Sequence, residues 1–464
     1  MSKNKKKHIK KETPGPEARR QLGKTGGALK EKTDAGIAAA TRGARRVSDA
    51  LSRFFAKKSS LIPLSFFLFC CILVFNLLSG YRYLFSDAKP MILLGAVQVY
   101  AIDYHVGFIS RVLIGEIVSW FCPTVSLAQI ASIAKACVLV SFVLQAVLAA
   151  VVTRKACMQK DWFVLPFIAV FVFHPFTCIQ NVVLLGILDL YNLILYLIFF
   201  FYANRKISLL LTPVFCFIGV LIHYQFTFAF FPGFFAIQLY MASKDGKTDV
   251  KKLAGAMVTM AVTLCAALYF VFFAKRNVTM SLEEFRSYLC SRYADYGKTG
   301  LSSEYLEYYV FNTFNGKTYD DPVEFLRLLI GFAVERFEAR TFSVYVYLMV
   351  PVICVLSSVW LCFVKHSRGL RRFTFLLFLI HPLLLVLTVV LSSDKYRWFA
   401  NYTMTALVML FAVYASGEPL FGVYKERVNA VLNTKAKKLC AAAAFAVYVV
   451  SGLILVSSVI KISR

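Results

Sequence analysis

Six ionisable residues stand out because they fall within, or at the edge of, long apolar segments of the chain. An ionisable side chain in that setting is costly unless it is paired or hydrated, so each one is a candidate for function. Carboxylates and imidazoles transfer protons, and a guanidinium binds phosphate. The topology argued below places all six at one membrane face, and they are Asp103, His105, His174, Asp189, His223 and Arg397.

Asp103 lies between an apolar lead-in, residues 91–102, and an amphipathic segment, residues 106–121, that predicts a helix on the membrane surface. A partly desolvated carboxylate at this position could act as a general base or as a metal ligand. The alternative is a helix N-cap, because Asp103 stands just before the predicted helix.

The predicted surface helix carries one arginine, Arg111. At four-residue spacing this arginine shares a helix face with small residues, namely Gly107, Gly115 and Ser119. Such a face would present Arg111 to an anionic headgroup, or would let it pair with Asp103.

Further candidates end or interrupt other apolar segments. His174, followed by Pro175, ends the third segment, Asp189 lies about two turns below the outer end of the fourth, and a tight hairpin carries His223 and Gln225. An unpaired carboxylate at the depth of Asp189 is expensive, so we expect it to meet a histidine, an arginine or water in a cavity. For each histidine the alternative is a structural hydrogen-bond donor.

The sharpest polar cluster, residues 394–398, occupies a short outer loop. Lys395 or Arg397 is predicted to bind a phosphate or pyrophosphate, while Trp398 suits interfacial depth and would border the substrate. The alternative is a simple interface anchor. His381, which precedes a proline in the ninth apolar segment, predicts a kink with a buried hydrogen bond.

The elements that must position these residues follow from composition. Of 464 residues, 59% are hydrophobic and 17% charged, and the apolar residues fall in blocks long enough to cross a bilayer. The helices are apolar all round, which excludes water-soluble folds. The net charge of +27 does not indicate nucleic acid, because lysine and arginine concentrate in the N-terminal tail and in the loops on one side.

The sequence therefore predicts an all-α polytopic membrane protein with about 11 transmembrane helices, its N-terminus inside, an outer-face amphipathic helix and a small helical outer cap. The predicted spans are 61–80, 127–152, 162–173, 182–202, 207–222, 226–241, 253–274, 341–364, 373–391, 401–415 and 439–460. The predicted organisation is a disordered basic cytoplasmic tail (1–33), a basic amphipathic inner-surface helix (34–58), spans one to seven (61–274, with the outer loop 81–126), the outer cap (275–340) and spans eight to eleven (341–464).

The layout resembles the GT-C superfamily of integral-membrane glycosyltransferases. The resemblance covers residues 61–275 through Asp103, the segment 106–121 and the short paired spans behind it. It implies a polyprenyl-phosphate-linked sugar donor held near Arg111 or Arg397, a glycan or lipid acceptor, and Asp103 as the base. The second acid that the family often has beside the first is missing, since Tyr104 and His105 follow Asp103, which leaves a divalent metal open and no metal ligand assigned.

Two other classes compete with this hypothesis. A cell-envelope polysaccharide polymerase or ligase would use the same outer arginines and histidines on a lipid-linked glycan. A transporter or flippase for a lipid-linked or anionic substrate would instead need polar residues near the bilayer midplane, which are few here. The basic tail favours a multi-pass protein of a bacterial plasma membrane.

Overall fold

The computed structural model describes residues 46, 49–50, 53–55, 57–78, 99–174, 177, 188–278, 280–296, 339–391 and 395–462. The chain divides into two units, residues 1–60 and residues 61–464. In the first unit the described part comprises short helical pieces and the 3-10 turn η1 (Lys58–Ser60). The predicted tail 1–33 and much of the predicted helix 34–58 lie outside the described residues.

The second unit is built from helices. Among its described residues the β-structure consists of one isolated bridge, between Val125 and Tyr293. In chain order the elements are α2 (Leu61–Leu78), η3 (Tyr104–Val106), α4 (Leu113–Phe121), α5 (Leu127–Gln159), η4 (Trp162–Val164), α6 (Leu165–Phe173), α8 (Leu188–Tyr202), α9 (Ser208–Ile222), α10 (Phe226–Ala229), α11 (Phe231–Ser243), α12 (Val250–Phe272), η5 (Ala274–Asn277), α13 (Leu282–Arg292), α16 (Ala339–Lys365), α17 (Gly369–Leu391), α18 (Lys395–Ala415), α19 (Leu420–Val431) and α20 (Lys435–Ile462).

Each of the eleven predicted spans coincides with a helix, or with a closely spaced pair of helices, in this order. Four described helical segments are long and apolar enough to cross a membrane, and they lie in α5, α12, α16 and α18. Shorter apolar helices, including α2, α6, α8 and α9, accompany them. The all-helical, multi-pass character of the protein is therefore as predicted.

Helix α18 is the most enclosed of the four, since 94% of its most apolar 18-residue stretch is buried. It packs against α5, α8, α10, α11, α16 and α17. The hydroxyl of Tyr196 on α8 donates to the carbonyl of Thr405 at 3.3 Å, and the Thr405 hydroxyl donates to the carbonyl of Ala229 at 3.0 Å. Helix α11 approaches closely at Gly233, where a Cβ atom would lie 2.3 Å from the Tyr196 hydroxyl oxygen. This packing sets the first turn of α18 beside α8 and α10.

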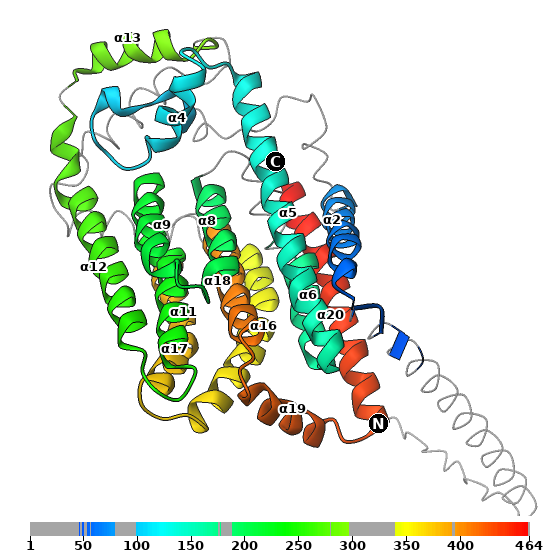
Figure 1. Ribbon diagram of the computed structural model, residues 1–464. Helices are drawn as coiled ribbons and strands as arrows, with labels where there is room; N and C mark the ends of the chain where they lie inside the picture. The colour runs from blue at the N-terminus through cyan, green and yellow to red at the C-terminus, as the bar shows by residue number, and fades with distance from the viewer. Residues whose placement is uncertain are drawn as a thin grey trace, which may run out of the picture. The chain divides into compact units, whose positions relative to one another are not determined.

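Helices α4 and α13 lie at one end of the bundle and α19 at the other (Figure 1). At the α19 end, Lys155 donates to the carbonyls of Tyr414 and Ala415, the last residues of α18, at 2.8 and 2.9 Å. Lys425 of α19 pairs with Asp161 at 2.7 Å. Lys155 of α5 satisfies carbonyls that the end of α18 leaves unbonded. The ion pair joins α19 to Asp161, which follows α5. Together these contacts hold α5, α18 and α19 against one another.

The predicted continuous surface helix 106–121 is wrong. The structure has η3 and then α4, separated by a loop in which Gly107 and Arg111 have positive φ angles of 141° and 82°. The chain breaks because this loop bonds to α9, with the Ser110 hydroxyl donating to the carbonyl of Val220 at 2.8 Å. Hence the predicted face of Gly107, Arg111, Gly115 and Ser119 is not formed.

The predicted outer cap, residues 275–340, is described only in its first part. Helix α13 begins with a capping box in which Ser281 and Glu284 bond reciprocally to each other's backbone N–H. It ends at Arg292, whose carbonyl accepts from the Val125 N–H at 2.8 Å next to the β-bridge. Residues 297–338 lie outside the described part of the chain.

Candidate functional site

Five of the residues proposed from the sequence come together at the α4 end of the bundle. They are supplied by the loop before α4, the start of α8, the α9–α10 hairpin and the first turn of α18. We name them the arginine cluster: Arg111, Asp189, His223, Gln225 and Arg397.

Asp189 and Arg397 form a buried ion pair. The Arg397 Nε and the Asp189 Oδ2 lie 3.1 Å apart, and their side chains are only 15% and 7% exposed. The N–H is not directed at the oxygen, so the contact is an ion pair without an aligned hydrogen bond between these two atoms. Arg397 also donates from Nη2 to the side-chain oxygen of Gln225 at 3.1 Å. The expectation that Asp189 meets an arginine is confirmed.

His223 occupies the hairpin between α9 and α10 and is buried. Its Nδ1 accepts from the Gln225 backbone N–H at 3.1 Å, which fixes the neutral imidazole with its proton on Nε2. Burial lowers the pKa of His223 well below its ordinary value, and the positive charges of Arg111 and Arg397 lower this pKa further. The imidazole is therefore uncharged near neutral pH.

Arg111 has a backbone φ of 82°, a value that residues other than glycine rarely adopt. Its N–H donates to the carbonyl of Leu221 at 2.9 Å. Its Nη2 donates to the Tyr224 hydroxyl at 3.1 Å, with the guanidinium carbon 5.1 Å from that ring's centre. The buried Nε has no hydrogen-bond partner, and no carboxylate pairs with Arg111, among the described residues.

These groups give the arginine cluster an excess of positive charge. Counted over the described residues alone, two guanidinium charges and one carboxylate meet here and the imidazole of His223 is neutral, so these described groups carry one net positive charge in a partly buried setting. Strained backbone of the kind seen at Arg111 costs on the order of 1–3 kcal/mol and persists where the surrounding structure dictates it. Such an arrangement is suited to bind an anion whose charge and oxygens complete the set of donors.

Asp103 belongs to a second group of contacts, centred on α13. Its Oδ1 accepts from the His105 N–H at 2.9 Å and caps η3, so the capping interpretation is confirmed for this short turn. Its Oδ2 lies 3.3 Å from the Arg292 Nε, and its own N–H donates to the Tyr288 hydroxyl at 2.9 Å. A carboxylate offers about four lone-pair sites, so these contacts leave acceptor capacity on Asp103.

The two remaining histidine candidates have other surroundings. His105 is exposed and stacks on the Tyr288 ring at a centroid distance of 5.6 Å. His174 is buried at the end of α6, where its Nε2 lies 2.9 Å from the Tyr448 hydroxyl on α20. The structure thus ties His174 to the packing of α20, as its structural alternative predicted.

The predicted outer loop 394–398 is helical from Lys395 onward, since these residues form the first turn of α18. Trp398 is buried there and its neighbour Arg397 enters the arginine cluster, whereas the side chain of Lys395 lies outside the described residues. Sequence reasoning missed Tyr224, Tyr288 and Arg292. Tyr224 could have been found, because it sits between two chosen residues of one tight hairpin.

Taken together, these observations describe a multi-pass α-helical membrane protein with a net-cationic, partly buried site at one end of its helices. No protein-family model matches the chain, and no curated protein or solved structure is significantly similar to it. Among the described residues, no three His, Cys, Asp or Glu side chains are grouped so as to hold a metal ion.

Proposed function

We propose that the protein is a membrane glycosyltransferase that moves a sugar from a polyprenyl-phosphate lipid to a glycan or lipid acceptor at the extracytoplasmic face. The observation that carries the proposal is the arginine cluster, whose net positive charge and unbonded Arg111 Nε suit the phosphate of such a donor. In this proposal a lipid phosphate reaches the cluster from the membrane, at the end of the apolar helices. In this proposal eleven helices span a bacterial plasma membrane, and the α4 end faces outward.

The proposed reaction is a single displacement. The acceptor oxygen attacks the anomeric carbon of the sugar while the bond from that carbon to the phosphate oxygen breaks, and the sugar configuration inverts. The acceptor proton passes to Asp103, and the lipid phosphate leaves with an additional negative charge. Arg111 and Arg397 stabilise that charge as it develops, which is the step in which fixed cations accelerate such reactions.

Asp103 can still accept a proton as the base in this scheme. Its side chain is 12% exposed, and the contacts with His105 and Arg292 leave lone pairs on both oxygens. From α13, Arg292 contacts the Asp103 carboxylate and Tyr288 accepts from the Asp103 backbone N–H, which supports a positioned group.

The test is a mass-spectrometric comparison of lipid-linked and surface glycans. Cells lacking the gene would be complemented with the wild type, Asp103→Asn, Arg111→Gln or the control Arg205→Gln, an exposed arginine between α8 and α9. We expect one glycan to disappear on deletion and to return only with the wild type and the control. Unchanged glycans in all strains would refute the proposal.

Transport is the second candidate, and one observation favours it. Asn192, one turn beyond Asp189 on α8, is fully buried, and both polar atoms of its amide have no partner among the described residues. An unbonded amide within a span is typical of a polar path through the membrane. Uptake of a labelled anionic solute into vesicles, abolished by Asp189→Asn but not by Asp103→Asn, would favour this candidate over the transferase.

A further inference from the structure

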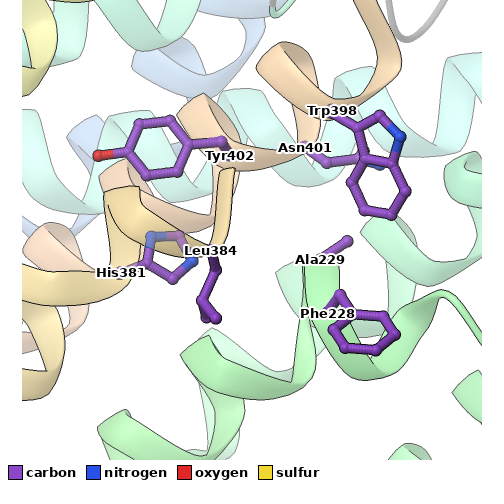
Figure 2. A pocket seen from close by; sticks show the side chains of 7 residues that line it. All are labelled: Phe228, Ala229, His381, Leu384, Trp398, Asn401 and Tyr402. Carbon is purple, nitrogen blue, oxygen red and sulfur yellow. The ribbon is translucent and has the colours of Figure 1, made fainter. Parts of the chain in front are cut away.

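The pocket lined by Phe228, His381 and Trp398 is too small for a substrate (Figure 2). Its cavity volume is about 10 Å³, which is space for one water molecule. A different feature lies at the end of the bundle away from α4, where the hairpin of α16 and α17 lies beside α19 (Figure 1). Charged side chains on the surface there have no part in the proposed reaction.

Exposed cations gather at that end of the bundle. Lys365 is the last residue of α16, and Arg368 lies in the short loop that follows it. Arg372 lies in the first turn of α17, and Arg427 lies on α19. All four of these residues are exposed to the surroundings of the protein.

The acids that reach this region leave the four exposed cations unpaired. Glu418, whose side chain is fully buried, pairs with Arg371, and Asp161 pairs with Lys425. Glu426 is exposed and takes part in no ion pair among the described residues. Within the part of the chain that the structure describes, none of the four exposed cations has a carboxylate partner.

Lys365 and Arg427 converge at the last turn of α16. The Nδ1 of His366 donates to the Cys362 carbonyl at 2.7 Å, which leaves Nε2 of the neutral imidazole as an acceptor. The Arg427 Nη2 lies 3.5 Å from that Nε2, at the outer limit for a hydrogen bond. Both Lys365 and Arg427 are close enough to the Cys362 thiol to act on it electrostatically. We call Lys365, His366 and Arg427 the basic triad.

Helix α19 holds Arg427 in a defined place. The Tyr424 hydroxyl lies 2.9 Å from the Ser358 hydroxyl of α16, and the Phe421 ring packs edge-on against Phe363 at a centroid distance of 4.9 Å. Phe421 and Tyr424 are both buried. Arg427 follows Tyr424 by about one helical turn, so the buried half of α19 limits where its guanidinium can reach. Such preorganisation lowers the entropic cost of binding a ligand.

Exposed apolar side chains border the basic triad along the helices. Leu361 lies one turn before Lys365 on α16, and Phe373 and Leu376 lie in the first two turns of α17, all of them about half-exposed. In a multi-pass protein, exposed apolar side chains of this kind face lipid tails, while cations at the helix ends lie at the depth of the headgroups. A molecule that contacts both surfaces has an apolar tail and an anionic head.

We propose that the basic triad binds the phosphate of an anionic phospholipid whose acyl chains lie along α16 and α17. Lys365 and Arg427 donate to the phosphate oxygens, and His366 orients the guanidinium. A zwitterionic lipid is disfavoured because its ammonium group is repelled by the same cations. A soluble anion would leave the apolar side chains without a role. The inference is independent of the proposed sugar transfer, because the triad and the arginine cluster lie at opposite ends of the bundle (Figure 1).

The experiment titrates the full-length protein in a non-ionic detergent and measures the tightest bound molecule by native mass spectrometry. The probes are dioleoylphosphatidylglycerol, dioleoylphosphatidylcholine and glycerol 3-phosphate, which carries the anionic head without a tail. Each cation beside an anionic headgroup contributes about a fivefold gain in affinity. Phosphatidylglycerol should therefore bind the wild type at least about tenfold more tightly than either other probe, because the lipid meets two such cations.

The test variant is Arg427→Gln, which should weaken phosphatidylglycerol about fivefold and leave phosphatidylcholine within twofold of the wild type. The double variant Lys365→Gln/Arg427→Gln should weaken phosphatidylglycerol about 25-fold. Arg205→Gln is the matched control, since it removes an exposed arginine from the loop between α8 and α9, at the same end of the bundle. It should change neither affinity by more than twofold. Substitutions of exposed side chains such as these should leave the melting temperature unchanged.

Four outcomes would overturn the proposal. Equal binding of the two lipids by the wild type would show that the triad is an ordinary solvated surface. Equal loss of phosphatidylglycerol binding in Arg427→Gln and Arg205→Gln would show an effect of net charge alone. Equal weakening of both lipids by Arg427→Gln would show a structural role, and binding of glycerol 3-phosphate as tight as that of phosphatidylglycerol would show a site for a soluble anion.

Discussion

Replacing Asp189 by asparagine should destabilise the protein more than any exposed substitution, because it removes the carboxylate that pairs with the buried Arg397 guanidinium. Removing one partner of a buried ion pair costs about 3–5 kcal/mol. We expect the lower end of that range, about 3 kcal/mol, because the 3.1 Å contact is not an aligned hydrogen bond and Arg397 keeps its bond to Gln225. This value corresponds to more than a hundredfold change in the unfolding equilibrium.

A double-mutant cycle measures the pair itself. Reversible unfolding in mixed micelles would compare Asp189→Asn, Arg397→Gln and the double variant, with Asp245→Asn as an exposed control that should stay within about 0.5 kcal/mol of the wild type. The double variant should lose less than the sum of the single variants, by at least about 1.5 kcal/mol. A coupling below about 0.5 kcal/mol would refute the assignment of a buried, mutually dependent pair.

Three further predictions concern the two groups of contacts. The pKa of His223 is lowered in the folded state, so below about pH 6.5 the unfolded chain binds a proton that the folded chain does not. The free energy of unfolding should therefore fall by up to about 1.4 kcal/mol per pH unit as the pH drops. His223→Gln should flatten that slope in unfolding titrations. Arg111→Gly should raise the melting temperature, since glycine accepts a φ of 82° without strain, yet abolish binding of a soluble short-chain prenyl phosphate; a lower melting temperature would contradict the assigned strain. Tyr288→Phe should cost about 1 kcal/mol and speed hydrogen exchange at the Asp103 amide, and unchanged exchange would count against the bond between them.

The positions of the helices were predictable because lipid imposes a simple pattern, in which apolar blocks alternate with basic or polar loops. The same pattern assigned Asp189, His223 and Arg397 to one face, and their convergence in the arginine cluster follows from that topology. Charge bias and span length thus located much of the candidate site, even though the chain segments that form it are far apart in the sequence.

Three features could not be predicted from the pattern of apolar blocks and polar loops, because they depend on tertiary contacts. Periodicity predicted an unbroken helix through Arg111, but bonds to α9 hold that residue at a positive φ. Nothing in the local sequence indicates that Asp103 pairs with Arg292, which arrives on a helix that follows seven predicted spans. Among the described residues the expected hydrogen bond of His381 is not formed at its buried Nδ1, and the ring stacks on Tyr402 instead.

The contacts of α13 also constrain how the protein is made. Asp103 bonds to Tyr288 across 185 residues of sequence, and Gln225 bonds to Arg397 across 172. A chain that enters the membrane from its N-terminus during synthesis therefore exposes the Asp103 loop long before its partners exist. The contacts of Asp103 are completed only by α13 and those of the arginine cluster only by α18, so a chain truncated before α18 would lack Arg397 and its bonds to Asp189 and Gln225. Assembly of the α4 end of the bundle is thus completed late in synthesis, when α13 and α18 arrive, because its contacts join segments far apart in the sequence.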